Sequence, residues 1–322
     1  MPRKLALCSI LTGLVLSATA ATAQDFPSRP ITILVGLAPG GITDVTARLY
    51  AETVSRNIGQ RIVVENRTGA GGGVAAAAVQ NAAPDGHTLL VFSGSQHATV
   101  PAVSNATYDP VKGFAPITYL FNSVVVLTVP ADNPAKTLAE LHDWGRKKPG
   151  GLTFGTPGLG SPSHLLGVKI LLAAKVPNQV VHYRGGSAMM ADLITGRVDF
   201  SWPTLSTSRA NIAEKKLRAL ALDADARWAP LPDVPTLKEL GFGNEQVASW
   251  FALGAPAGTP PAIVAKLNEE FIKASRDPEL RRKLGENGTP IITSTPEEMG
   301  RAMVQEWETM QQLAKTLNLR QQ

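Results

Sequence analysis

Two glycine-rich segments carry the residue types that bind a small anion. They are LAPGGITDVTARL, residues 37–49, and GTPGLGSPSHLLG, residues 155–167. Each has the pattern of a strand end, a tight turn and a helix start. Glycines let a ligand approach the backbone closely, and the N–H groups and dipole of the helix favour negative charge. An ordinary strand-to-helix turn explains one such segment equally well, so the prediction of an anion site depends on there being two.

The first segment offers backbone donors beside a carboxylate. Gly40 and Gly41 form the turn, and Thr43 or Asp44 is predicted to cap the helix that follows, over about residues 44–57. Asp44 could act as a general base. A carboxylate in the first turn of a helix more commonly fixes its own loop, and we interpret Asp44 in that way.

The second segment adds hydroxyl groups to the same arrangement. Ser161 is a good N-cap, and Pro162 stands where a first-turn proline is tolerated. Thr156 and Ser163 provide further hydroxyl donors. Ser161 and His164 could be read as a nucleophile and its base. Three residues apart in a first helical turn, however, both are expected to be committed to capping.

Phosphate, metal and hydrolytic chemistry lack their motifs in this chain. No lysine follows the glycines as in a P-loop, and GAGGGV at residues 69–74 has valine where a dinucleotide-binding motif needs glycine. There is neither a G-x-S-x-G elbow nor a metal-ligand spacing. The histidines are scattered, at His87, His97, His142, His164 and His182. The sequence therefore predicts a protein that is not an enzyme and that needs neither cofactor nor metal.

His97 is the histidine that we single out for a role in binding. It lies in SGSQHA, residues 93–98, directly after a predicted strand, where loops are expected to face a ligand cleft. Ser93 begins the same loop. Near the end of the chain, Met299, Met303 and Trp307 are spaced by four, which predicts a helix packed on a core rather than a cofactor site.

The N-terminus has the features of an export signal. Arg3 and Lys4 precede an apolar run, and the small residues Ala21 and Ala23 precede Gln24, which predicts a cleavable signal peptide over residues 1–23. The single cysteine, Cys8, lies inside this segment, so the mature chain has no disulfide and no thiol. The formal net charge of +5 and the 6% aromatic content do not indicate nucleic-acid binding.

Apolar, β-branched runs alternate with helical patterns, which predicts two α/β lobes around a ligand cleft. Strands of the first lobe are expected at residues 31–37, 61–65, 88–92 and 247–254. Strands of the second lobe are expected at residues 124–129, 152–154, 180–182, 198–202 and 217–222. We assign residues 24–122 and 247–322 to lobe 1 and residues 123–246 to lobe 2.

Several blocks together resemble the Bug family, the receptors of tripartite tricarboxylate transporters. They include FPSRPITILVGLAPGGITDVTARL, IVVENRTGAGG, AAPDGHTLL, GTPGLGSPSHLLG, HYRGGSAMMADLITGRVDF and SWFALGAPAGTPPAIVAKLN, in order from Phe26 to about Thr295. The resemblance implies a type II periplasmic binding fold, with a ligand carboxylate held between the two glycine turns and lobes that close on it. It also implies a monomeric receptor in the periplasm that serves a small and a large membrane permease subunit.

The resemblance carries over to particular positions of this chain. In the first turn these are Gly40, Gly41, Ile42, Thr43 and Asp44, and in the second Thr156, Gly158, Gly160, Ser161 and His164. Ser93, Tyr183 and the loop after Asp199, which includes Trp202 and Thr204, are expected to complete the wall.

The chain departs from the family pattern at three places near these turns. Ile42 replaces a usual glycine, His182 replaces a common proline, and Pro203-Thr204 replaces an Asp-Asn pair. We hypothesise that Ile42 and Trp202 make the far end of the pocket apolar. An aromatic or aliphatic carboxylate is then favoured over an amino acid, because a buried unpaired ammonium is costly. The alternative is that Trp202 packs inside its lobe and contacts no ligand.

Three functions remain open from the sequence. The first is a transport receptor that delivers a small organic carboxylate to a permease. The second is a solitary binding protein that signals to a periplasmic sensor kinase. The third, least favoured, is a hydrolase or isomerase that reuses the cleft.

Overall fold

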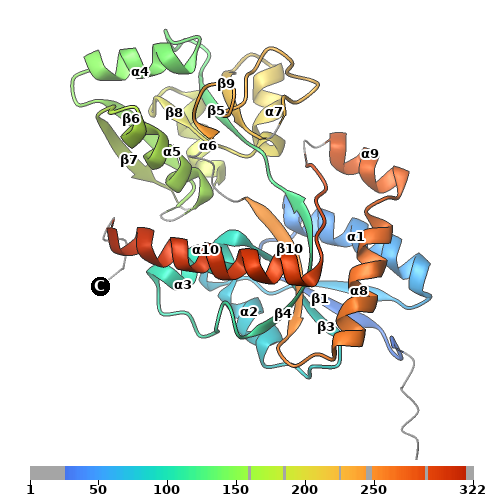
Figure 1. Cartoon of the computed structure of the whole chain (residues 1–322). Helices are drawn as coiled ribbons and strands as arrows, with labels where there is room; N and C mark the ends of the chain where they lie inside the picture. The colour runs from blue at the N-terminus through green and yellow to red at the C-terminus, as the bar shows by residue number, and fades with distance from the viewer. Residues whose placement is uncertain are drawn as a thin grey trace, which may run out of the picture.

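The computed structural model describes residues 26–158, 161–183, 186–224, 226–243, 249–286 and 289–316. The predicted signal peptide and Gly160 lie outside these residues. The described chain forms two α/β lobes, each built on its own five-stranded sheet (Figure 1). No helix within the described residues is both long and apolar enough to span a membrane.

The sheet of the first lobe has the strand order β2-β1-β3-β10-β4. Its strands are β1 (Ile31–Val35), β2 (Ile62–Asn66), β3 (Thr88–Ser93), β4 (Phe114–Asn122) and β10 (Trp250–Pro256). β1 pairs in parallel with β2 and β3, whereas β10 is antiparallel to both β3 and β4. The sheet is therefore mixed, because β10 returns to it from the second lobe in the opposite direction.

Helices cover both faces of the first sheet. They are α1 (Ile42–Ile58), α2 (Gly73–Gln80), α3 (Val100–Val103), α8 (Pro261–Ala274), α9 (Pro278–Glu286) and α10 (Pro296–Thr316), with short turns η1 (Ala70–Gly72) and η2 (Ser95–Thr99). One core contains Tyr50, Leu267 and Leu284 from α1, α8 and α9. The opposite core contains Val79 of α2 and Met299 and Met303 of α10. The prediction that these methionines pack on a core is confirmed.

The sheet of the second lobe has the strand order β7-β6-β8-β5-β9. Its strands are β5 (Val125–Pro130), β6 (Leu152–Thr156), β7 (Asn178–His182), β8 (Phe200–Ser201) and β9 (Leu217–Asp223). Its helices are α4 (Leu138–Lys147), α5 (Pro162–Ala173), α6 (Gly186–Ile194) and α7 (Leu205–Ala213). The main core of this lobe includes Leu141, Phe154, Leu166 and Phe200.

The predicted strands are present with bounds shifted by a few residues, but one strand was not predicted. β4 begins in the segment GFAPIT, where glycine and proline weaken the strand pattern. It is an edge strand that pairs with β10 only after the chain has passed through the second lobe. A pairing between such distant segments leaves no local signal in the sequence.

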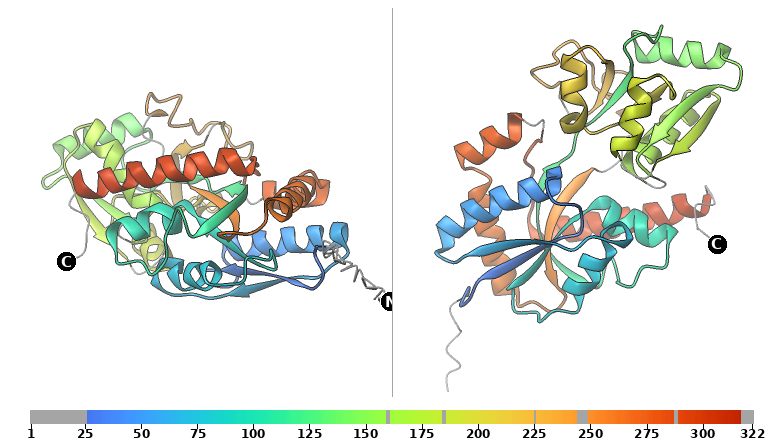
Figure 2. Two further views of the ribbon diagram at one scale, coloured as in Figure 1. Left: turned by 60° about the horizontal axis from the view of Figure 1, so that its bottom comes forward. Right: turned by 180° about the vertical axis from the view of Figure 1, so that it is seen from behind.

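The chain passes between the lobes at the carboxyl edges of both sheets. β4 ends at Asn122 and β5 begins at Val125, so the passage takes two residues, and the N–H of Ser123 donates to the carbonyl of Ser249 on the returning segment at 2.9 Å. β5 is antiparallel to β8 and so begins where β8 ends. The carboxyl ends of β1 and β3 and those of β6 and β8 therefore lie on the sides of the two sheets at which the chain crosses. Figure 2 shows the two lobes from behind.

Candidate anion-binding site

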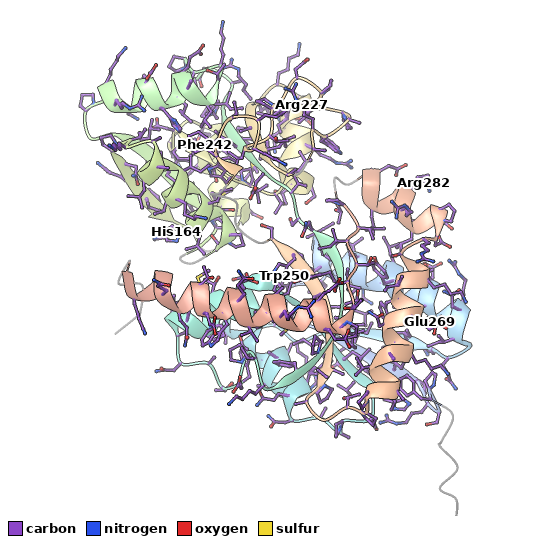
Figure 3. The ribbon with its side chains drawn as sticks, in the orientation of Figure 1. His164, Arg227, Phe242, Trp250, Glu269 and Arg282 are labelled. Atoms are coloured by element: carbon purple, nitrogen blue, oxygen red, sulfur yellow. The ribbon has the colours of Figure 1, made fainter. Side chains whose placement is uncertain are left out.

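Two helix N-termini lie at the facing edges of the sheets. α1 follows β1, and α5 follows β6. Leu165, in the first turn of α5, packs with Ala98 and Ala102, which follow β3 in the first lobe. Because β3 is the neighbour of β1, this contact brings the start of α5 to the region where α1 begins. His164 likewise lies at the end of α5 that faces the first lobe (Figure 3).

The start of α1 has unused backbone donors. Its N-cap is Gly41, which makes no side-chain cap, and Gly40 has a φ of +77°. Within the described chain, the N–H groups of Ile42, Thr43 and Asp44 find no acceptor. The Thr43 hydroxyl, on a residue only 1% exposed, also has no partner. Buried donors are normally paired, so this cluster is suited to an anion.

The prediction that Thr43 or Asp44 caps α1 is wrong. The helix begins two residues before Asp44, which therefore lies at the third helical position. Its Oδ2 accepts a hydrogen bond from the N–H of Gly40 at 2.9 Å, and its Oδ1 accepts one from Nε of Arg48 at 3.0 Å. The carboxylate thus reaches back to the turn and fixes its backbone, as expected of a loop-fixing residue.

Arg48 links Asp44 to the next strand, β2, and we call Asp44, Arg48 and Asn66 together the brace of the first turn. Its Nη2 donates to Oδ1 of Asn66 at 3.0 Å, and Nδ2 of Asn66 donates to the carbonyl of Leu37, also at 3.0 Å. Burial alone would raise the pKa of Asp44, but the hydrogen bonds from Arg48 and Gly40 hold that pKa below its ordinary value. Asp44 is therefore an ionised structural group. Sequence reasoning missed Arg48 and Asn66, although the i, i+4 spacing of Asp44 and Arg48 is a recognisable signal.

The start of α5 is capped by a side chain, as predicted. Ser161 is the N-cap, and its Oγ accepts from the N–H of His164 at 3.3 Å, with Pro162 in the first turn. Ser163 is not available to a ligand, because its hydroxyl donates to the carbonyl of Trp202 at 2.5 Å. Ser161 still has its own hydroxyl proton, which the cap does not use.

Thr156 ends β6 and joins the turn to a pair of histidines. Its Oγ1 lies 2.9 Å from Nδ1 of His182, and the ring of His182 meets that of His164 edge to face, with centroids 4.8 Å apart. Burial, followed by the nearby His182, lowers the pKa of His164 to about 4, and burial also lowers the pKa of His182. Both rings are therefore neutral near pH 7.

His97 does not face the junction of the lobes, so that expectation is wrong. The side chain is 2% exposed and packs against Phe92 and Trp250, with Nε2 2.7 Å from the carbonyl oxygen of Met303. Figure 3 shows Trp250 against α10, the helix that covers this side of the sheet. Ser93 accepts the N–H of Gln96 at 3.2 Å and so caps the turn that contains His97.

Trp202 packs inside the second lobe, which corrects the hypothesis that it lines a pocket. It is 1% exposed and belongs to the same core as Phe154 and Phe200. Ile42 is half-buried and packs against the core of the first lobe. Of the two residues expected to make the far end of the pocket apolar, only Ile42 still lies at a glycine turn.

The two remaining residues expected in the wall of the site, Thr204 and Tyr183, differ in where they lie. Thr204 is the N-cap of α7 and pairs with the start of β5 through Val125, at the junction of the lobes. The Tyr183 hydroxyl donates to Oδ2 of Asp192 at 2.8 Å, and burial and this carboxylate raise the pKa of Tyr183 to about 12. The Tyr183 hydroxyl is therefore directed to α6, and its backbone N–H donates to the carbonyl of Thr156 at 2.9 Å. In the part of the chain that is described, no cluster of three His, Cys, Asp or Glu side chains could hold a metal ion.

Two α/β lobes between which the chain crosses, with helix N-termini at their facing edges, are the architecture of periplasmic binding proteins. The family described as tripartite tricarboxylate transporter family receptor matches residues 46–319. A protein of Pseudomonas sp. (strain P51), encoded in the tcbD-tcbE intergenic region, is 36% identical over 97% of this chain and 93% of its own length. The chain therefore belongs to the tripartite tricarboxylate transporter receptor family, and it is a solute-binding protein rather than an enzyme.

Solved structures agree with this assignment. Rpa4515 of R. palustris with adipate is 34% identical, with a TM-score of 0.79, over 91% of this chain and 98% of that one. MatC of Rhodopseudomonas palustris with bound malate is 32% identical, with a TM-score of 0.75, over 89% of this chain and 99% of that one. The resemblance inferred from the sequence blocks and the type II periplasmic binding fold are thus confirmed.

Proposed function

We propose that this protein captures a small organic carboxylate between the N-termini of α1 and α5 for a tripartite tricarboxylate-type transporter. The observation that carries the proposal is the set of unpaired N–H groups at Ile42, Thr43 and Asp44, next to a turn without side chains. One carboxylate oxygen can accept from adjacent helix N–H groups, and the helix dipole adds to the attraction. The malate in MatC and the adipate in Rpa4515 support a carboxylate as the ligand.

The proposed ligand has an uncharged, aliphatic or aromatic middle section rather than an α-ammonium group. Asp44 is the acidic residue at the first turn, and its two oxygens already accept from Gly40 and Arg48. An ammonium group there would have to compete with Arg48. Because Trp202 lies in the core of the second lobe, the proposed apolar character of the pocket depends on Ile42.

The remaining parts of the proposal concern location and assembly. We propose that residues 1–23 direct export to the periplasm, that the mature receptor is a monomer, and that residues 24–122 with 247–322 and residues 123–246 move as lobes. A ligand that contacts both helix N-termini favours the closed arrangement in proportion to its preference for that state. The closed form is then the one that the small and large permease subunits receive.

A ligand screen by thermal unfolding tests the capture itself. The mature protein is heated with malate, adipate, benzoate, aspartate, glutamate or inorganic phosphate. A ligand at about 100 times its Kd adds about 2.7 kcal/mol of stability, enough to raise Tm by roughly 5 °C. We expect this shift with at least one of malate, adipate and benzoate. Stabilisation by aspartate or glutamate alone overturns the ligand class, and no shift with any carboxylate overturns the proposed function.

A further inference from the structure

The Thr156 hydroxyl makes more polar contacts than its single proton can serve at once. Oγ1 lies 2.9 Å from Nδ1 of His182 and 3.2 Å from the carbonyl oxygen of Gly158, and it accepts from the N–H of Gly158 at 3.3 Å. A hydroxyl has one proton to donate. Either His182 or the Gly158 carbonyl therefore receives that proton, but not both.

The choice depends on the protonation state of His182. When the ring is neutral and carries its proton on Nε2, the hydroxyl donates to Nδ1, its nearer partner. When the ring is protonated, Nδ1–H donates to Oγ1, and the hydroxyl proton turns to the carbonyl of Gly158. Both arrangements use contacts already present, so protonation changes the hydrogen bonding of the second glycine turn without rebuilding it.

His182 is placed to meet a ligand at this turn. The residue as a whole is exposed at the carboxyl end of β7, but its ring is partly covered by Thr156 and by the buried His164 in the first turn of α5. The titratable group packed against it in the described chain is His164. The next residue, Tyr183, directs its hydroxyl to Asp192, which is paired with Arg197. No carboxylate among the described contacts therefore faces the His182 ring.

We propose that His182 contacts the ligand at the second turn and that its protonation, relayed by Thr156 to the Gly158 carbonyl, strengthens the capture of a dianionic carboxylate. This inference rests on the proposed function and adds a specificity residue to the same site.

The direction of the pH effect follows from the charges. In the unliganded protein burial keeps the pKa of His182 below 6.5, and the contact with His164 opposes a second charge. A bound carboxylate places negative charge nearby and raises that pKa. Ligand binding therefore takes up protons, and affinity rises as pH falls toward the pKa of the complex.

Calorimetric titration with adipate and with malate at pH 8 and pH 6 tests this link, because both ligands stay largely ionised over that range. We expect affinity at pH 6 to exceed that at pH 8 by about threefold or more, with proton uptake detected by changing the buffer. H182Q keeps a donor at the site and should lose the pH dependence. T156V should weaken the pH dependence of binding. Q179A changes an exposed side chain on the same strand and should keep the parent behaviour.

The outcomes separate this inference from the proposed function. Equal affinity at both pH values in the parent, or an undiminished pH dependence in H182Q, overturns the role of His182 while capture stands. Failure of every carboxylate to bind overturns capture and this inference together. Thermal unfolding of each variant confirms folding. Nitrogen NMR of His182 provides a second readout, because the relay requires the Nε2–H tautomer in the free protein at pH 8.

Discussion

The two glycine turns occupy matching places in the two lobes, but they present their donors differently. The turn before α1 has a glycine N-cap and leaves backbone N–H groups unpaired, and it is braced by Asp44, Arg48 and Asn66. The turn before α5 spends a backbone N–H on the Ser161 cap and depends on side chains, Thr156 and His182 among them.

Each turn would form one half of the ligand site. The turn before α1 is then a fixed half-site, and the turn before α5 is an adjustable one. Backbone donors held by an ionised brace offer the same charge at every pH near neutrality. A hydroxyl can redirect its one proton, and an imidazole can change both its hydrogen-bonding role and its charge. We infer that the first turn provides most of the affinity for a carboxylate and that the second adjusts which ligands are held and when.

The largest expected effect on ligand affinity comes from covering the backbone donors of the first turn. Gly41 has a φ of −72°, which other residues adopt, and a Cβ there would lie 3.3 Å from the carbonyl oxygen of Ala38, a tight contact that a shift of a few tenths of an ångström relieves. G41V should therefore fold, with a branched side chain over the N–H groups of α1. We expect affinity for adipate to fall at least tenfold, or about 1.4 kcal/mol.

A matched substitution far from the turns controls for the added bulk. Gly285 is exposed in α9, and a Cβ there meets nothing within 4 Å. G285V should bind adipate as the parent does. If G41V also binds as the parent does, the first turn is not part of the site and the comparison between the turns is lost.

The second expected effect is on stability, through the brace of the first turn. D44N removes the charge that holds Gly40 and Arg48 on a side chain that is 5% exposed. Losing charge-assisted hydrogen bonds at such a site should cost about 1–3 kcal/mol of unfolding free energy in urea. D143N, whose pair with Arg146 is exposed, should cost no more than about 0.5 kcal/mol.

The pH dependence of that cost gives an independent check. The folded pKa of Asp44 lies below its ordinary value of 3.8, so the ionised brace contributes its full stability above that value. The contribution is lost as pH falls through the folded pKa. The difference between parent and D44N should therefore be constant near neutral pH and narrow below pH 3.8. A difference that grows on acidification would show that the carboxylate is not the stabilising form.

Sequence reasoning succeeded where the relevant contacts are local. The turns at Gly40–Gly41 and before Ser161, the Ser161 cap and the buried methionines of α10 all follow from neighbours within one or two helical turns. It failed where distant segments decide. His97 is buried because α10 covers it from more than 200 residues away, and Trp202 is turned into the core by the packing of its lobe. The residue types in the sequence could not by themselves reveal that Thr156 joins the second turn to His182.

The smallest expected effect distinguishes the two uses of Ser161 in the second turn. S161A removes both the N-cap and a hydroxyl donor, whereas S161G removes the hydroxyl but retains a residue that is acceptable at an N-cap. We expect unfolding to be easier by about 1 kcal/mol in S161A and by only a few tenths of a kcal/mol in S161G. If the hydroxyl also donates to the ligand, both variants should lose a similar few-fold affinity for adipate, since that loss follows the missing donor and not the cap. Loss of affinity in S161A alone would mean that Ser161 acts through helix stability. The adjustable half-site would then consist of Thr156 and the histidines without it.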